Sequence, residues 1–384
     1  MEAALYDPDA GFFARGGGAG RAGADFLTSP EVGALYGALV ARALDEWWAR
    51  LDRPDPFIVV DAGAGRGQLA RDVLRATPGC RNALRYVLVE HSAALRQAEA
   101  EHLPLEPAAL ALGPAVRPDP DEEAVTVPGL GPVVTALAEL PAGPLTGVVV
   151  ANELLDNLPF RIVEAAGDGR WLEVRVAAGS PRRFVEMTVP ADDALAAEAD
   201  GLVDGLSVPA GFRLPIPTGL VAWVHDCGVM LRRGVVAVVD YGDSVEGFLA
   251  RGWGFGDTPG PGGFGDSSGP GRGWLRTYRG QRRGGHPLED PGTQDITADV
   301  PLGRLRRAAA QAGFAVLDEM TQAEWLRSLG IEALVEEARA AWHGRSATDL
   351  SALAARSRVS EAEALLDPAG LGAHRVMILG KGVS

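Results

Sequence analysis

Two kinds of apolar pattern alternate along the first half of the chain. Short runs rich in valine, isoleucine and leucine are separated by stretches in which apolar residues recur every three or four positions. The first kind is typical of strands and the second of helices. We therefore expect strands at 57–61, 85–90, 133–135 and 145–151, with helices after Glu31, from 67, and through Leu103. Because the run at 145–151 is apolar on both faces, the sheet is expected to be parallel and covered on both sides.

The second half of the chain contains a different pattern. Segments 161–164, 171–176 and 184–189 alternate with a period of two, which predicts an antiparallel β meander inserted into the α/β frame. We also expect helices at 219–232, 302–312 and within 322–367, strands at 234–241, 314–318 and 373–379, and a loop at 252–273. The predicted division is an N-terminal segment at 1–50, an α/β core with helical additions at 51–159 and 216–384, and a β-rich insert at 160–215.

The first predicted strand runs into a glycine-rich turn, Asp61-Ala62-Gly63-Ala64-Gly65-Arg66-Gly67, and a helical pattern follows at once. Glycines in such a turn let a cofactor approach the backbone and the N-terminus of the helix. A dinucleotide fingerprint would need its third glycine at 68, where this chain has Gln68. The spacing is instead typical of S-adenosylmethionine sites. We therefore assign cofactor binding to Asp61, Gly63, Ala64, Gly65 and Gly67.

The second predicted strand ends in an acid, Glu90, which follows Gly67 by 23 residues. A carboxylate at this place offers two acceptor oxygens to the two adjacent ribose hydroxyls of a nucleoside. We therefore add Glu90 to the cofactor site. The alternative is an ordinary glycine-rich turn in which Glu90 caps the next helix.

A second polar cluster, Asn152-Glu153-Leu154-Leu155-Asp156-Asn157, follows the buried strand at 145–151. Ligands of open parallel sheets bind beyond the carboxyl ends of the strands. We therefore expect Asn152, Glu153 and Asp156 to lie beside the methyl group of the cofactor, where paired carboxylates could hold a guanidinium. The alternative is that Asn152 and Asp156 cap a helix and that Glu153 is solvated.

Composition narrows the class of protein further. The net charge of −15 argues against a nucleic-acid partner, and no apolar run is long enough to cross a bilayer. Lysine occurs only at Lys381, which argues against a Walker-type phosphate loop and a Schiff base. Two isolated cysteines and a start without a signal-peptide pattern predict a reduced, cytoplasmic setting, and the histidines have no metal-ligand spacing, so no metal is expected.

The ordered series of these motifs resembles the MidA family, which includes mitochondrial complex I assembly methyltransferases. It comprises Leu5-Tyr6-Asp7-Pro8, Asp25-Phe26 with Thr28-Ser29-Pro30-Glu31, the glycine-rich turn, Glu90-His91-Ser92, the cluster from Asn152 to Pro159, Asp240-Tyr241-Gly242, and Pro291-Gly292 with Asp295-Ile296-Thr297. Departures are Gln281, Ala62, Ala64 and a start close to the Leu-Tyr-Asp segment.

The resemblance implies a class I (Rossmann-like) methyltransferase fold that uses S-adenosylmethionine. It implies that Glu153 and Asp156 face an arginine guanidinium, as expected of a family whose mitochondrial members are implicated in dimethylating an arginine of a complex I subunit. It also implies that the segment from Asp25 to Glu31, with Thr28 and Ser29, covers the cofactor within the N-terminal segment.

Three hypotheses on function remain open at this point. The first is a methyltransferase that acts on protein arginine. The second is a methyltransferase that acts on a small metabolite. The third is a non-catalytic binding or assembly protein that retains the fold. A homodimer is left open in each case.

Overall fold

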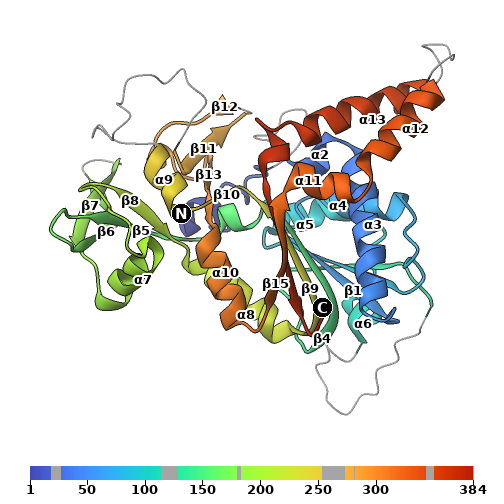
Figure 1. Ribbon diagram of the computed structural model, residues 1–384, viewed down its shortest axis with the longest axis horizontal. Coiled ribbons are helices and arrows are strands. Elements are labelled where there is room, and N and C mark those ends of the chain that lie inside the picture. The colour runs from blue at the N-terminus through green and yellow to red at the C-terminus, as the bar shows by residue number, and fades with distance from the viewer. Residues whose placement is uncertain are drawn as a thin grey trace.

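A seven-stranded sheet forms the centre of the structure (Figure 1), a computed structural model that describes residues 1–18, 27–113, 129–179, 183–252, 273–280, 282–342 and 350–383. Its strands are β1 (Phe57–Ala62), β2 (Leu84–Val89), β3 (Val133–Leu137), β4 (Leu145–Asn152), β9 (Leu231–Asp240), β15 (Ala315–Thr321) and β16 (Arg375–Lys381). They lie in the order β15-β16-β9-β4-β1-β2-β3. Among these strands β16 runs in the opposite direction to the other six, so its pairs with β15 and β9 are antiparallel and the other pairs are parallel.

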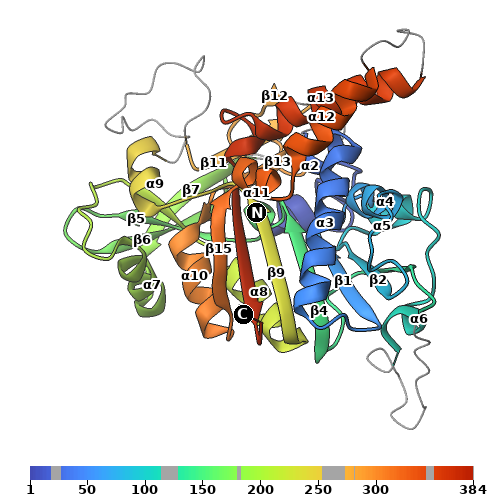
Figure 2. The same ribbon diagram turned by 45° about the vertical axis from the view of Figure 1, so that its right-hand side comes forward.

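Helices cover both faces of this sheet because its strands are apolar on both sides. Val59 belongs to the core cluster under α3 (Ala34–Arg50) and α4 (Gln68–Arg75), and Val60 belongs to the cluster under α8 (Thr218–Met230) and α10 (Leu302–Gln311). In Figure 2, α3 crosses in front of the strands and α8 lies behind them. Further helices are α1 (Glu2–Tyr6), α2 (Ser29–Val32), α5 (Ala93–Glu99), α6 (Ala108–Leu112), α11 (Gln322–Ser328), α12 (Ile331–Trp342) and α13 (Leu350–Leu366).

A separate four-stranded antiparallel sheet stands beside the central one, at the left of Figure 1. It consists of β5 (Arg161–Ala165), β6 (Trp171–Gly179), β7 (Arg183–Pro190) and β8 (Arg213–Ile216), with α7 (Asp193–Val203). The predicted meander is confirmed. The sequence did not predict β8 and α7, which also belong to this part of the structure. Smaller elements complete this side: β10 (Gly242–Asp243), α9 (Val245–Arg251), β11 (Leu275–Arg279), β12 (Arg282–Arg283), β13 (Asp295–Ala298) and β14 (Val300–Pro301).

The predicted α/β class is confirmed, and the differences are local. The helix expected through Leu103 ends at Glu99, and turns at His102 and Leu103 follow it, after which Leu103 packs into the core. Pro104 disfavours a helical conformation at Leu103. Thr28 directly precedes α2, but its side chain makes no capping hydrogen bond. Residues 253–272 of the expected loop, residues 19–26 of the N-terminal segment, and Gln281 lie outside the described residues.

The topology creates a crevice at one edge of the sheet. From β1 the chain continues to β2 and β3 on one side, and later to β4 and β9 on the other. Ala62 is in register with both Val89 and Ala151, so β1, β2 and β4 end at the same level. In such sheets the ligand lies beyond the carboxyl ends of the strands at the point where the order reverses. That point is between β1 and β4.

Candidate functional site

A cavity of about 670 Å³ opens over the carboxyl ends of β1, β2 and β4. This volume lies within the roughly 300–1,000 Å³ that is usual for small-molecule sites. Besides the glycine-rich turn, its wall includes the end of β2, the end of β4 with the loop that follows, and the N-terminal segment. Their lining residues include Glu90 and His91, then Asn152, Glu153 and Leu154, and finally Tyr6, Phe13, Thr28 and Pro30.

The glycine-rich turn has a left-handed backbone that favours glycine, with φ of 74° at Gly63, 59° at Gly65 and 75° at Gly67. A Cβ atom at Gly65 would meet no atom within 4 Å, so this residue borders open space. A Cβ atom at Gly67 would lie 2.8 Å from Leu103 Cδ1 behind the turn. Gly63, Ala64 and Gly65 therefore line the cavity, whereas Gly67 shapes the start of α4 from outside the lining.

Glu90 is fixed by two backbone N–H groups. Its Oε2 accepts from Gly65 at 3.0 Å and its Oε1 from Ser92 at 2.7 Å. Burial raises the pKa of Glu90. Ser92, not Glu90, caps α5, which removes the capping alternative. Lone pairs of the Glu90 carboxyl group remain for ligand hydroxyls, and its role in holding ribose stays a prediction.

Asp61, at the end of β1, is the second carboxyl group on this side of the cavity. Its Oδ2 accepts the hydroxyl of Tyr86 at 3.0 Å. Burial raises the pKa of Asp61 to about 7. The folded protein therefore retains the proton of this acid to a higher pH than a solvent-exposed aspartate would.

Glu153, the first residue after β4, has a φ of 50°, which is uncommon for a residue with a side chain. Its N–H donates to the carbonyl of Val239 at 2.8 Å and so fixes this conformation. Its Oε1 accepts from the N–H of Ser29 at 3.2 Å and from Nδ2 of Asn152 at 3.4 Å. Burial, together with the nearby Asp156, raises the pKa of Glu153 to about 8. The side chain is only 5% exposed, so the alternative of a solvated glutamate is wrong.

Asp156 does not line the cavity, so the expectation that it faces the acceptor beside Glu153 needs correction. After Glu153 the chain turns through a 3-10 helix, Leu155–Asn157, in which successive side chains point in different directions. Asp156 accepts a hydrogen bond from the hydroxyl of Thr297, away from the cavity, and burial raises its pKa to about 6. The turn itself is held by Asp240, whose Oδ2 accepts the N–H groups of Leu155 and Asp156 at 2.8 and 3.3 Å.

The two predicted cofactor-covering residues take different places. Thr28 lines the cavity, whereas Ser29 lies behind Glu153. Asn152 is on the wall, and its Oδ1 accepts the hydroxyl of Tyr36 at 2.6 Å. Neither Asn152 nor Asp156 caps a helix. Tyr36 was not foreseen as a site residue, because its position in α3 fits the apolar pattern of a core helix.

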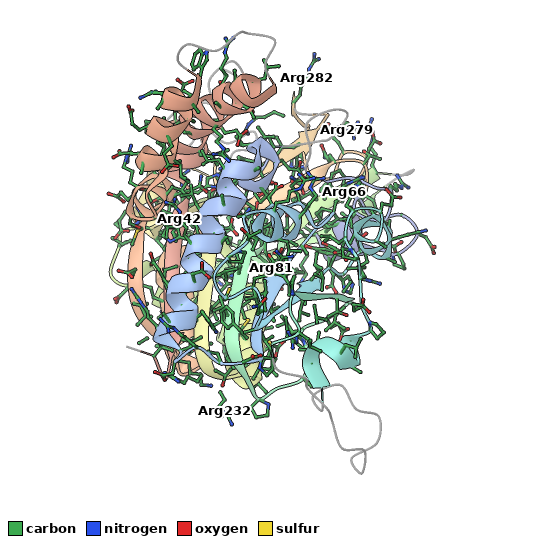
Figure 3. All side chains as sticks on the ribbon, turned by 90° about the vertical axis from the view of Figure 1, so that its right-hand side faces the viewer. Arg42, Arg66, Arg81, Arg232, Arg279 and Arg282 are labelled. Carbon is green, nitrogen blue, oxygen red and sulfur yellow. The ribbon has the colours of Figure 1, made fainter. Side chains whose placement is uncertain are left out.

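One face of α8 extends the cavity, which the sequence did not lead us to expect. The face repeats at spacings of three and four residues and comprises Gly219, Ala222, Trp223, Asp226, Val229 and Met230. Among the described residues that line the cavity, seven are acidic and a single one, Arg66, is an arginine. Figure 3 shows Arg66 and the other labelled arginines at separate places on different elements. The cavity therefore suits a cationic ligand better than an anionic one.

The residues of the cavity fit a sulfonium nucleoside. Gly65 leaves room for close approach to the backbone, and Glu90 offers acceptors for sugar hydroxyls. Asp61 and Glu153 are buried acids that have no cationic side chain at hydrogen-bond distance among the described residues, and a positively charged centre would favour their ionised forms. The fold and this cavity together define the class of S-adenosylmethionine-dependent methyltransferases.

Comparison with protein families agrees with this class. A family model described as "Putative S-adenosyl-L-methionine-dependent methyltransferase" matches residues 39–320, and the chain belongs to this family. This match confirms the predicted family and the predicted class of fold. The description of the family also confirms S-adenosylmethionine as the predicted cofactor.

Individual relatives are more distant. The protein arginine methyltransferase NDUFAF7 homolog of Drosophila melanogaster is 27% identical over 82% of this chain and 66% of its own length. Protein arginine methyltransferase NDUFAF7 of Homo sapiens is 27% identical over 86% of this chain and 69% of its own length, and both are named as mitochondrial. The chain thus spans about two thirds of the length of these relatives.

A solved structure shares the whole fold. The crystal structure of a protein from Burkholderia thailandensis bound to S-adenosyl-homocysteine superposes with a TM-score of 0.76 at 27% identity. The match covers 100% of this chain and 87% of that one. The resemblance therefore extends beyond the central sheet to the inserted β sheet and the added helices.

Within the described ranges, no three His, Cys, Asp or Glu side chains are arranged to hold a metal ion. The same ranges contain no helix that is both long and apolar enough to cross a membrane. Cys80 and Cys227 are buried free thiols.

Proposed function

We propose that this protein transfers a methyl group from S-adenosylmethionine to a nitrogen atom of an arginine side chain in a protein. The observation that carries the proposal is the buried carboxyl group of Glu153 on the wall of a cavity with more acidic than basic lining residues, directly after the strand beside the glycine-rich turn. The names of the relatives from Drosophila melanogaster and Homo sapiens support the same acceptor.

The hydrogen bonds of Glu153 leave one oxygen for the acceptor. Ser29 and Asn152 both donate to Oε1, and no described residue has a hydrogen bond to Oε2 that competes with a ligand. A guanidinium offers N–H groups that form charge-assisted hydrogen bonds with such a carboxylate. Glu153 can therefore align an arginine nitrogen next to the cofactor, and alignment is the main requirement of methyl transfer.

Bound S-adenosylmethionine supplies the electrophilic methyl group. As the arginine nitrogen bonds to the methyl carbon, the bond from that carbon to sulfur would break, and the sulfur would keep the electron pair and leave as the neutral thioether of S-adenosylhomocysteine. The nitrogen loses a proton, and the ionised Glu153 accepts that proton late in the step. The raised pKa of Glu153, about 8, is consistent with this role once the cation binds, because a nearby positive charge favours the ionised carboxylate.

The test is transfer of a tritiated methyl group from S-adenosylmethionine into a cell lysate. We expect label in the protein fraction, released as methylated arginine after hydrolysis and identified by mass spectrometry. Label confined to small molecules would support a metabolite acceptor instead. No transfer to either fraction, with cofactor binding intact in calorimetry, would support a docking platform.

Two variants localise the activity. Glu153→Gln should still bind the cofactor, with less preference for S-adenosylmethionine over S-adenosylhomocysteine at high pH, but should lose roughly 10²–10⁴-fold in turnover, the usual contribution of a general base. Gly65→Val should abolish cofactor binding, because its side chain would fill the open space beside the turn. Glu337→Gln, on the exposed surface of α12, is the matched control and should change neither.

A further inference from the structure

His374 is buried next to Glu153, immediately before β16. It is 2% exposed, and neither ring nitrogen has a hydrogen-bond partner among the described residues. Its Nδ1 lies 3.9 Å from Oε1 of Glu153. Buried polar atoms are nearly always paired in folded proteins, so an unpaired imidazole beside a carboxyl group on a cavity wall points to a function.

The position of His374 is fixed by its backbone and its ring. Its carbonyl accepts the N–H of Gln322 at 2.7 Å, and its ring centroid lies 4.0 Å from that of Tyr241. Gln322 is fully buried, and its Oε1 accepts the hydroxyl of Ser29 at 2.8 Å. Ser29 in turn donates its N–H to Oε1 of Glu153. Gln322 therefore connects Ser29 and His374, and both of these residues lie next to Oε1 of Glu153.

We propose that His374 is a positioning residue for Glu153, whose Oε1 receives the Nδ1–H of the neutral imidazole when the carboxylate is ionised. This rests on the proposed function of Glu153. An ionised carboxylate attracts an N–H donor more strongly than the neutral acid does, so ligand binding closes the gap of 3.9 Å. With three donors on Oε1, the other oxygen stays turned to the acceptor.

The imidazole acts as a donor and not as a base. Burial and the nearby Arg276 lower the pKa of His374 to about 3, which keeps the ring neutral with one N–H. The titratable and charged groups that face the Glu153–His374 pair are Tyr36, Asp156, Asp240, Tyr241, Arg276 and Asp295. All of them are retained in the variants below, so a change between variants reports on position 374.

The test measures the dissociation constants of S-adenosylmethionine and S-adenosylhomocysteine by calorimetry from pH 6 to 9. The two ligands differ in the methyl group and its positive charge, so the ratio of their dissociation constants reports the ionisation of carboxylates near the sulfur. We expect the preference for S-adenosylmethionine to rise with pH, and the Glu153-dependent part of this rise to vanish in Glu153→Gln.

Three variants at position 374 separate hydrogen bonding from packing. His374→Leu should move the midpoint of the rise upward by about one pH unit, the size of one hydrogen bond to a charged group. His374→Asn, which keeps a donor at the place of Nδ1, should restore the midpoint. The amide of His374→Gln reaches the place of Nε2 and not that of Nδ1, so its midpoint should shift as in His374→Leu. It replaces His374→Leu in the test if the leucine variant does not fold.

Each outcome decides the matter. An unchanged midpoint in His374→Leu or His374→Gln overturns the inference, and so do equal shifts in all three variants, since these would reflect packing. An identical pH dependence in unmodified protein and Glu153→Gln would instead show that Glu153 is not near the methyl group. That result refutes the proposed function and is distinguishable from failure of the His374 inference alone.

Discussion

Glutamine at position 153 should stabilise the ligand-free protein at high pH, although it removes the carboxylate on which the proposed activity depends. Burial raises the pKa of Glu153 from 4.5 to about 8 in the folded protein. Between these values the unfolded chain has released a proton that the folded chain retains. The free energy of unfolding therefore falls as the pH rises, and the loss is complete above about pH 8. Glutamine carries no charge and escapes this loss.

The magnitude follows from the difference between the two pKa values. About 3.5 pH units at about 1.4 kcal/mol per unit give an upper limit of about 5 kcal/mol. The hydrogen bonds from Ser29 and Asn152 to Oε1 are available to the glutamine carbonyl as well. Because proteins relax around a buried charge, we expect about 2–3 kcal/mol of the limit to be realised.

The assay is urea unfolding of the two proteins without ligand at pH 4.5 and at pH 9. The variant should be more stable by about 2–3 kcal/mol at pH 9 and should differ by less than about 1 kcal/mol at pH 4.5. Glu337→Gln, an exposed control, should match the unmodified protein at both values. A stability difference that does not change with pH would refute the reasoning, because it would show that Glu153 is not buried as an acid.

Three further predictions concern the support of the site. Gly67→Ala should cost about 1–3 kcal/mol in urea unfolding, because its Cβ atom would clash behind the turn, whereas Gly65→Ala should cost less and instead weaken cofactor binding measured by calorimetry. Asp240→Ala should cost at least about 2 kcal/mol, because it leaves three buried N–H groups without an acceptor. Asp240→Asn should cost less, because its carbonyl oxygen can still accept the N–H groups of Leu155 and Asp156, while its amide nitrogen cannot accept that of Tyr241. Tyr36→Phe should leave Asn152 Oδ1 without its donor and lower the unfolding free energy by about 1–2 kcal/mol.

Local patterns predicted most of the central sheet and the first part of the site. A β-branched run, a turn that needs positive φ and a helical period fall within one short segment around Gly65, so their meaning does not depend on distant residues. The same holds for Glu90, because it ends a strand whose place beside β1 is set by the usual βαβ connection. The strand β8 was missed because its four residues, Arg213–Ile216, are too few to establish a period.

The second part of the site depends on contacts that no local pattern encodes. Glu153 and Asp156 stand three residues apart in the same polar cluster, yet only Glu153 reaches the cavity, because the turn between them sends their side chains in different directions. Ser29 and His374 come to Glu153 from opposite ends of the chain. The residues next to them in the sequence do not indicate a contact with Glu153, so only the three-dimensional structure shows that both lie beside it.

The presence of several buried acids in this cavity is best explained by the binding of a cation beside them. Each carboxyl group that loses water without gaining a positive partner has its pKa raised, as Asp61 and Glu153 do, and so lowers stability at neutral and high pH. A fold under selection for stability alone would replace such groups with neutral ones of similar shape. A sulfonium cofactor and a guanidinium acceptor would supply the missing charge at the moment of use. Lower stability at neutral and high pH and a preference for cationic ligands are then two consequences of the same buried carboxylates.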